Sequence, residues 1–207
     1  MGQPSAPGFF PTDGGRAAST GHVSDAELVA RARQGDHAAF GELVERHRAA
    51  VYRAAHAALG SASEAEDAAQ EAFLAAYQKM GTYRAEASFK TWLLSIAWHR
   101  ALSRRRSLVS RWRRFASGEL LEPAVSRETR TQEGALIDAE MAHHVERLVR
   151  ALPARLRDPL LLCAAGEQTY GEIAVVLGIP EGTLKWRVAE ARRQLKQRLV
   201  RLGYGHE

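Results

Sequence analysis

The residues of this sequence best suited to chemistry are cationic and aromatic side chains close to its C-terminal end, beginning at Thr183. At about 100° per residue, a helix here places Leu184 and Val188 on one face, toward the rest of the fold. The remaining surface carries groups that can contact phosphates and base edges in a major groove: Thr183, Lys185, Trp186, Glu190 and Arg193. The alternative is that Trp186 packs on another helix of the same chain.

The stretch before this helix predicts the element that positions it. Thr169 and Glu172 are spaced as a capping box that starts a helix, and Gly178 ends that helix. Pro180 then starts the second helix, which is expected to run to about Leu199. A helix, a tight turn and a basic second helix are typical of the helix-turn-helix that reads DNA. An ordinary helical hairpin in a bundle is the alternative.

A second aromatic and cationic stretch covers residues 82–106, where Ser88 is expected to cap a helix. Its inward face is predicted to carry Phe89, Trp92, Leu93, Ile96 and Ala97. Its outward face is predicted to carry Thr91, Ser95 and Trp98. Rings interleaved with arginine and lysine can stack unpaired bases while neutralising the nucleic-acid backbone, so this stretch is a candidate for binding a single strand.

An acidic surface is expected on the helix that ends near Met80, because no lysine or arginine occurs between Ala57 and Gln78. One side of that helix is rich in alanine and is predicted to pack closely against other helices. The other side carries Glu64, Asp67, Gln70 and Glu71, with Leu74 exposed beside them. Phosphate repulsion would oppose contact with DNA, so these residues predict a protein partner with a basic surface. The alternative is a merely solvated polar face.

The start and stop signals of the helices predict an all-α fold of two small helical domains. In the first, residues 23–106, Ser24 and Asp36 cap two helices and either Ser61 or Ser63 caps the third. Residues 1–22 are expected to be a flexible, disordered tail, and residues 107–134 a flexible linker that lets the domains sit far apart. In the second, residues 135–207, Pro159 predicts either a helix that begins with Asp158 as its cap or a kinked helix.

Composition excludes several classes of protein. The net charge is +5, with positive charge concentrated in two places, which suits contact with nucleic acid. No apolar run approaches the ~20 residues that span a bilayer, so we expect a cytoplasmic protein without membrane insertion. Cys163 is the only cysteine, which excludes an intramolecular disulfide. No phosphate-binding loop, nucleophile arrangement or metal-ligand spacing is present, so we expect no catalytic residue, metal or cofactor.

Taken together, the two halves resemble the sigma-70 family of bacterial RNA polymerase sigma factors, in the compact extracytoplasmic-function (ECF) group. In the first half the resemblance rests on Glu66-Asp67-Ala-Ala-Gln70-Glu71-Ala-Phe73 and on Ser88-Phe89-Lys-Thr-Trp92, which are similar to conserved region two. In the second half it rests on Ala151-Leu-Pro153-Ala-Arg155 and on the stretch from Tyr170 to Arg187, which are similar to region four.

The resemblance implies a non-catalytic factor that binds core RNA polymerase and promoter DNA, held inactive in many members by an anti-sigma factor. It implies a polymerase-binding surface of Glu64, Asp67, Gln70, Glu71 and Leu74. It implies recognition and melting of the -10 promoter element by the helix from Ser88 and the loop before it, with candidate residues Tyr83, Arg84, Lys90, Thr91, Trp98, His99, Arg100, Arg104 and Arg105. It implies reading of the -35 element by Thr183, Lys185, Trp186, Arg187, Glu190 and Arg193.

Departures from the family pattern limit what carries over. His99 stands where an asparagine is frequent and Ser103 where an aspartate is usual, so the preferred -10 sequence does not follow from the resemblance. Two other classes remain as alternatives. A stand-alone helix-turn-helix regulator explains the second half but leaves the acidic and aromatic helices unused, and a helical adaptor predicts no affinity for DNA.

Overall fold

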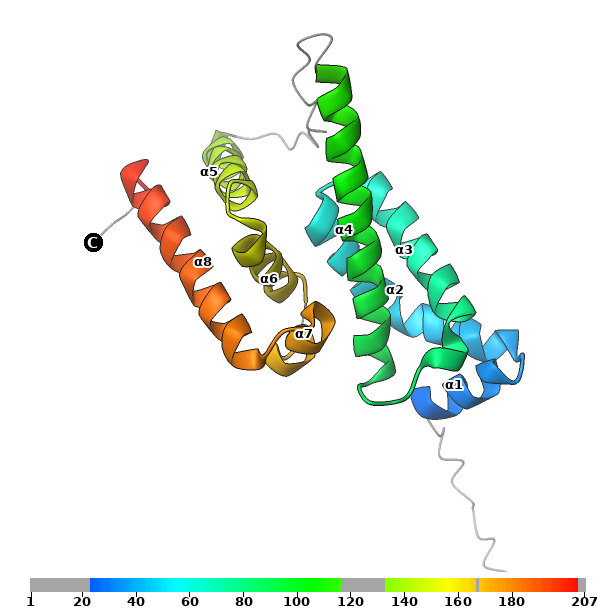
Figure 1. Cartoon of the computed structure of the whole chain (residues 1–207). Helices are drawn as coiled ribbons and strands as arrows, with labels where there is room; N and C mark the ends of the chain where they lie inside the picture. The colour runs from blue at the N-terminus through cyan, green and yellow to red at the C-terminus, as the bar shows by residue number, and fades with distance from the viewer. Residues whose placement is uncertain (1–22, 117–132, 167, 205–207) are drawn as a thin grey trace, which may run out of the picture.

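The regular elements of the chain are helices. The structure is a computed structural model that describes residues 23–116, 133–166 and 168–204, and every regular element in these ranges is helical (Figure 1). The first half contains α1 (Asp25–Arg33), α2 (His37–Leu59), α3 (Ala62–Gln78), the 3-10 turn η1 (Met80–Thr82) and α4 (Phe89–Ala116). The second half contains α5 (Glu133–Arg150), α6 (Ala154–Ala164), α7 (Tyr170–Leu177) and α8 (Glu181–Arg201). The expected all-α fold is confirmed, whereas the expected tail at residues 1–22 lies outside the described residues.

The helices of the first half begin and end where the capping residues predict. Ser24 and Glu27 form a complete capping box at the start of α1, and the side chain of Asp36 accepts from the backbone N–H of Ala39 at the start of α2. Gly60 ends α2 in the left-handed region at φ 69°, where a side chain would be strained. Ser61, rather than Ser63, caps α3.

Small side chains let the helices of the first half approach closely. The side of α3 that faces the bundle carries buried alanines, among them Ala65, Ala68, Ala72 and Ala76. α2, α3 and α4 pack against one another, and Leu43 of α2 and Leu93 of α4 are fully buried in this core. The bundle therefore holds the outer side of α3 and the exposed residues of α4 on a rigid support.

The helix α4 extends further than the sequence pattern predicts. It continues to Ala116, so the expectation of a linker that begins at residue 107 is wrong for its first ten residues. The apolar period fails there, and none of residues 107–111, the part of this extension whose side chains the structure describes, is buried. Arginine is a good helix former, and neither proline nor glycine occurs before Gly118. Most of the expected linker, residues 117–132, lies outside the described residues.

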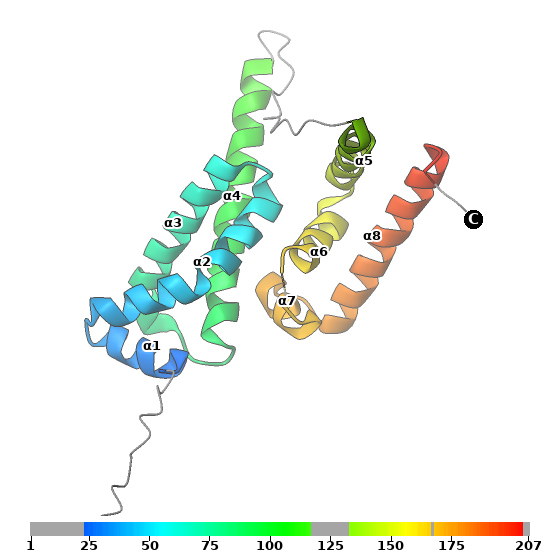
Figure 2. The same ribbon diagram turned by 180° about the vertical axis from the view of Figure 1, so that it is seen from behind.

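The two halves of the chain pack against each other. α7 lies against α4 and α6 against α2 (Figures 1 and 2). One apolar core runs through both halves and joins Val51 and Trp98 of the first to Leu162, Ile173 and Leu184 of the second. The expected linker would let the two domains sit far apart, whereas in this arrangement of the chain they pack together.

Pro159 lies inside α6 instead of starting it. The helix begins at Ala154 after Pro153, so Asp158 is not its cap. The carboxylate of Asp158 is free of that role and binds Arg105 of the first half.

Neither a membrane span nor a metal cluster is found in the described part of the chain. Among residues 23–116, 133–166 and 168–204, no helix is both long and apolar enough to cross a membrane. Within the same ranges, no three histidine, cysteine, aspartate or glutamate side chains lie close enough together to hold a metal ion.

Candidate functional site

The second helix of the helix-turn-helix, α8, exposes three of its six predicted DNA-binding side chains, Lys185, Trp186 and Arg193, whereas Thr183, Arg187 and Glu190 are half-buried. Thr169 and Glu172 form both bonds of the capping box of α7, and Gly178 ends α7 at φ 63°. Leu184 and Val188 of α8 are buried beneath, as predicted. Trp186 is 60% exposed, so the alternative in which it packs on another helix is wrong within the described residues.

Ion pairs along α8 set the charge of this surface. Lys185 is bound by Glu181 at 2.6 Å, one turn earlier on the same helix. Glu190 accepts from Nε and Nη2 of Arg193, both at 2.7 Å. These bonds, together with one from Gln194, lower the pKa of Glu190 to about 2. Lys185, Trp186 and Arg193 are therefore the exposed candidates on this helix, and each of the two cations among them is paired with a glutamate of α8.

The outward face predicted for α4 is partly wrong. Trp98 has 0% of its surface exposed and Thr91 is buried. The buried side of α4 is a stripe at alternating spacings of one and three residues, formed by Leu93, Leu94, Ala97, Trp98 and Ala101. α4 contacts α2 and α3 on one side and α7 on the other, so the face that one isolated domain would leave to solvent is covered. The unbroken apolar stripe was the sequence signal for this burial.

Trp92, which the sequence pattern places in the core, lies at the surface margin of α4. It is half-buried, and its ring lies 5.2 Å from the ring of Tyr83, centroid to centroid. The hydroxyl of Tyr83 donates to the carbonyl oxygen of Ala87 at 2.8 Å, which fixes the loop before α4. The two rings form an aromatic pair. The sequence predicted Tyr83 as a DNA-binding residue but placed Trp92 in the core.

The other candidate residues of α4 and the loop before it divide into three groups. Arg84, His99 and Arg100 are exposed. Lys90 is half-buried. Arg104 and Arg105 are both bound inside the molecule, Arg104 by carboxylates of α3 and Arg105 by Asp158. In this arrangement of the chain, three of the nine candidates are exposed.

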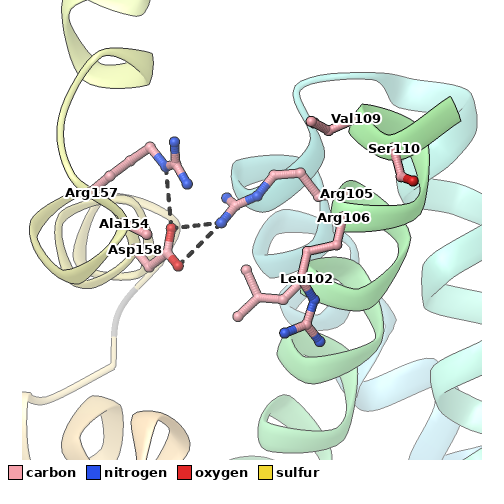
Figure 3. A pocket seen from close by; sticks show the side chains of 8 residues that line it. All are labelled: Leu102, Arg105, Arg106, Val109, Ser110, Ala154, Arg157 and Asp158. Atoms are coloured by element: carbon pink, nitrogen blue, oxygen red, sulfur yellow. Dashed lines mark hydrogen bonds and ion pairs between the residues drawn. The ribbon is translucent and has the colours of Figure 1, made fainter. Parts of the chain in front are cut away.

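Arg105 lies at the edge of a crevice between the two halves (Figure 3). The crevice has a volume of about 540 Å³ and is walled by α4 on one side and α6 on the other. Nη2 of Arg105 donates to both carboxylate oxygens of Asp158, at 2.9 and 3.1 Å. Nη1 of Arg105 donates to the carbonyl oxygen of Ala58, and Arg53 of α2 donates to that of Ala165. Polar contacts therefore reinforce the apolar packing between the halves.

The acidic residues lie together on the outer side of α3, as predicted. Asp67, Gln70 and Glu71 are exposed and Glu64 is half-buried. Leu74, beside them, is 65% exposed, the largest exposed fraction among the large apolar side chains of the described residues. We call these five residues, Glu64, Asp67, Gln70, Glu71 and Leu74, the acidic ridge. Its composition, carboxylates beside one apolar side chain, suits a protein surface that carries basic and apolar groups.

Comparisons with known proteins show the family to which the two halves of the chain are similar. Residues 43–112 match the family model described as Sigma-70 region 2, and residues 143–195 match that of Sigma-70, region 4. The chain is 31% identical to the RNA polymerase sigma-H factor of Pseudomonas aeruginosa, with 84% of this chain and 93% of that protein covered. It is 30% identical to the ECF RNA polymerase sigma-E factor of Escherichia coli, with 86% and 95% covered.

A solved structure shows the same fold. It is the sigma factor RpoE in complex with the anti-sigma factor NepR from Bartonella quintana. The TM-score is 0.57 at 23% sequence identity, and the match covers 76% of this chain and 94% of that chain.

Proposed function

The chain belongs to the sigma-70 family of RNA polymerase sigma factors, in the ECF group, and from this we propose how its surfaces divide the work of starting transcription. In this proposal the chain binds core RNA polymerase, directs it to promoters through their -10 and -35 elements, and promotes melting of the DNA. The observation that carries it is the separation of charge on the surface. Exposed carboxylates gather on α3, whereas exposed cations lie in the loop before α4, further along α4 and on α8; the rings beside them are the half-buried Tyr83 and Trp92 and the exposed Trp186.

The acidic ridge on α3 is the proposed polymerase-binding surface. Carboxylates attract basic side chains over a long range and speed the encounter of two proteins. Leu74 adds an apolar contact at the centre of such an interface. The same surface would repel the phosphates of DNA, so it and the DNA-binding surfaces can be occupied together without competing for one partner.

The loop before α4 and the exposed side of that helix form the proposed surface for the -10 element. Tyr83 and Trp92 supply ring faces for unpaired bases, and Arg84, His99 and Arg100 lie exposed near the same element. Flipped bases that find stacking partners repay part of the energy of unpairing. We assign Trp98 to the core instead, because it is fully buried, and Arg105 reaches the strand only after leaving Asp158.

The exposed residues at the start of α8 form the proposed surface for the -35 element. Lys185 and Arg187 can contact phosphates or base edges, and Trp186 offers an apolar face to thymine methyl groups. Their position at the N-terminal part of the second helix is the part of a helix-turn-helix that enters the major groove.

We also propose that an anti-sigma factor controls the chain. The RpoE structure with a matching fold contains such a factor. In this chain the two halves already enclose a crevice lined by Arg105, Arg106 and Arg157, so a partner that binds both halves could hold them together. We expect the protein to act in the cytoplasm, where polymerase and DNA are found.

Run-off transcription with purified core polymerase on a promoter library tests the proposal. We expect the wild-type chain to confer defined start sites and to enrich one pair of -35 and -10 sequences. Core polymerase alone is the matched control. If the chain binds duplex DNA but never captures core polymerase, the stand-alone regulator replaces this proposal, and if it binds neither, the helical adaptor does.

A further inference from the structure

Helices α3 and α4 pack against each other (Figure 1). Arg104 of α4 reaches across to the acidic ridge on α3. Its Nη2 donates to Oδ2 of Asp67 at 2.6 Å, and its Nη1 donates to Oε1 of Glu71 at 2.9 Å. Its Nε donates to Oε2 of Glu64. One guanidinium from a second helix thus binds all three carboxylates of the acidic ridge.

The three carboxylates need a cation to stay together. Glu64, Asp67 and Glu71 are separated by three and four residues, so they lie on one face of α3 and repel each other. A guanidinium can satisfy all of them, because its five N–H donors lie in one rigid plane. A lysine ammonium is a point charge without that fixed fan of donors.

The guanidinium lies beneath the carboxylates instead of covering them. The side chain of Arg104 is 23% exposed, against 53% for Asp67 and 46% for Glu71. Arg104 uses one oxygen of each carboxylate, Oδ2 of Asp67 and Oε1 of Glu71. The second oxygen of each exposed carboxylate can therefore accept a hydrogen bond from a partner while Arg104 holds the first. The bond to Glu64 also raises the pKa of Arg104, so its charge persists at every physiological pH.

We propose that Arg104 is a positioning residue for polymerase binding, which holds Asp67 and Glu71 in the arrangement that lysine or arginine side chains of the polymerase meet. This inference rests on the proposed function. It moves Arg104 from the DNA-binding residues to the polymerase-binding ones. Preset carboxylates bind more tightly, because less side-chain freedom is lost and less repulsion is overcome when the partner arrives.

If Arg104 instead blocked the carboxylates, its removal would change the affinity for polymerase in the opposite direction. If Arg104 merely occupied the carboxylates in place of the partner, its removal would free them and strengthen polymerase binding. A positioning role requires that its removal weakens binding, so the sign of the change separates the two.

The test measures the affinity of the full chain for core polymerase by fluorescence anisotropy. We expect Arg104→Ala to weaken binding about tenfold and Arg104→Lys to restore part of the loss, since it keeps charge without the planar fan. Arg48→Ala, which removes an exposed arginine paired with Glu45 on α2, is the matched control and should leave the affinity unchanged.

A double-mutant cycle shows whether Arg104 acts through the carboxylates. Asp67→Ala should weaken binding less in the Arg104→Ala background than in the wild type. Thermal unfolding and binding to a -35 duplex, measured on the same variants, detect a merely structural role, which would lower both together with polymerase affinity. Unchanged or tighter polymerase binding by Arg104→Ala, additive effects in the cycle, or parallel loss of duplex binding would each overturn the inference. If the wild type itself fails to capture core polymerase, the proposed function fails first.

Discussion

Arg105 of α4 donates from Nη2 to both carboxylate oxygens of Asp158 on α6, at 2.9 and 3.1 Å, and so fastens the second half of the chain onto the first. Arg157 donates to the same carboxylate from Nε at 3.3 Å. Arg105 is one of the candidates for the -10 strand, and a guanidinium engaged in this way is not available to a phosphate. The contact between the halves therefore opposes binding of the promoter strand at this residue.

Replacing Asp158 with alanine is expected to loosen the two halves. The change leaves Arg105 largely buried without its carboxylate, which lowers the free energy of unfolding by about 1–3 kcal/mol. Small-angle scattering should show a larger radius of gyration, and the free protein should bind promoter DNA more tightly. Glu45→Ala, which breaks the exposed pair with Arg48 on α2, should do neither. An unchanged radius and unchanged DNA affinity in Asp158→Ala would show that apolar packing alone holds the halves.

Replacing each of the two tryptophans of α4 with alanine is expected to have a different effect, on stability for one and on strand binding for the other. Trp98→Ala empties a fully buried site and should cost about 3–5 kcal/mol in urea denaturation. Trp92→Ala, at a half-buried site, should cost less stability but weaken binding of a single-stranded -10 oligonucleotide to the holoenzyme by about 1–3 kcal/mol. Equal destabilisation by both changes, with unaltered strand binding in Trp92→Ala, would place both rings in the core.

Loss of exposed side chains at the start of α8 is expected to affect only duplex binding. Trp186→Ala and Lys185→Ala should each weaken binding to a -35 duplex by about 1 kcal/mol or more, because each removes a contact to the groove or its phosphates. Affinity for core polymerase should not change. Arg201→Ala, in the last turn of the same helix, serves as control. Parallel loss of polymerase binding would argue against separate surfaces.

Charge reversal on α3 is expected to abolish polymerase capture. Asp67→Arg places a cation among the carboxylates and beside Arg104, which should weaken binding to core polymerase about a hundredfold while duplex binding persists. The comparison is Glu45→Arg, an equal charge change at an exposed site of α2. Retained capture by Asp67→Arg would remove the acidic ridge from the interface.

The ion pair between Glu190 and Arg193 on α8 predicts a measurable pH dependence of stability. The pKa of Glu190 is lowered to about 2 by its bonds with Arg193 and Gln194. A lowered pKa means that the carboxylate stabilises the fold above its ordinary pKa of 4.5 and that this contribution is lost as the pH falls toward about 2. Carboxyl NMR titration should show the low value, and Arg193→Ala should return it toward 4.5. A value near 4.5 in the wild type would mean that the pair does not persist in solution.

Much of the fold and of the site follows from local signals that the sequence contains in full. Capping residues such as Ser24, Asp36 and Thr169 determine where helices start, because they bind N–H groups within three residues of themselves. Gly60 and Gly178 determine where helices end. The acidic ridge and the exposed start of α8 were also predictable, since each is one face of one helix and needs only the helical period.

What the sequence could not determine are the relationships between elements distant along the chain. The period of α4 alone could not show that α7 packs against α4, where the hydroxyl of Thr91 donates to Glu172 of α7. Nor could it show that Arg104 and Arg105, adjacent in sequence, bind carboxylates on two different helices, α3 and α6. Both outcomes depend on how the two halves pack. That packing depends on the summed burial of apolar surface from both halves, a long-range quantity that no local spacing records.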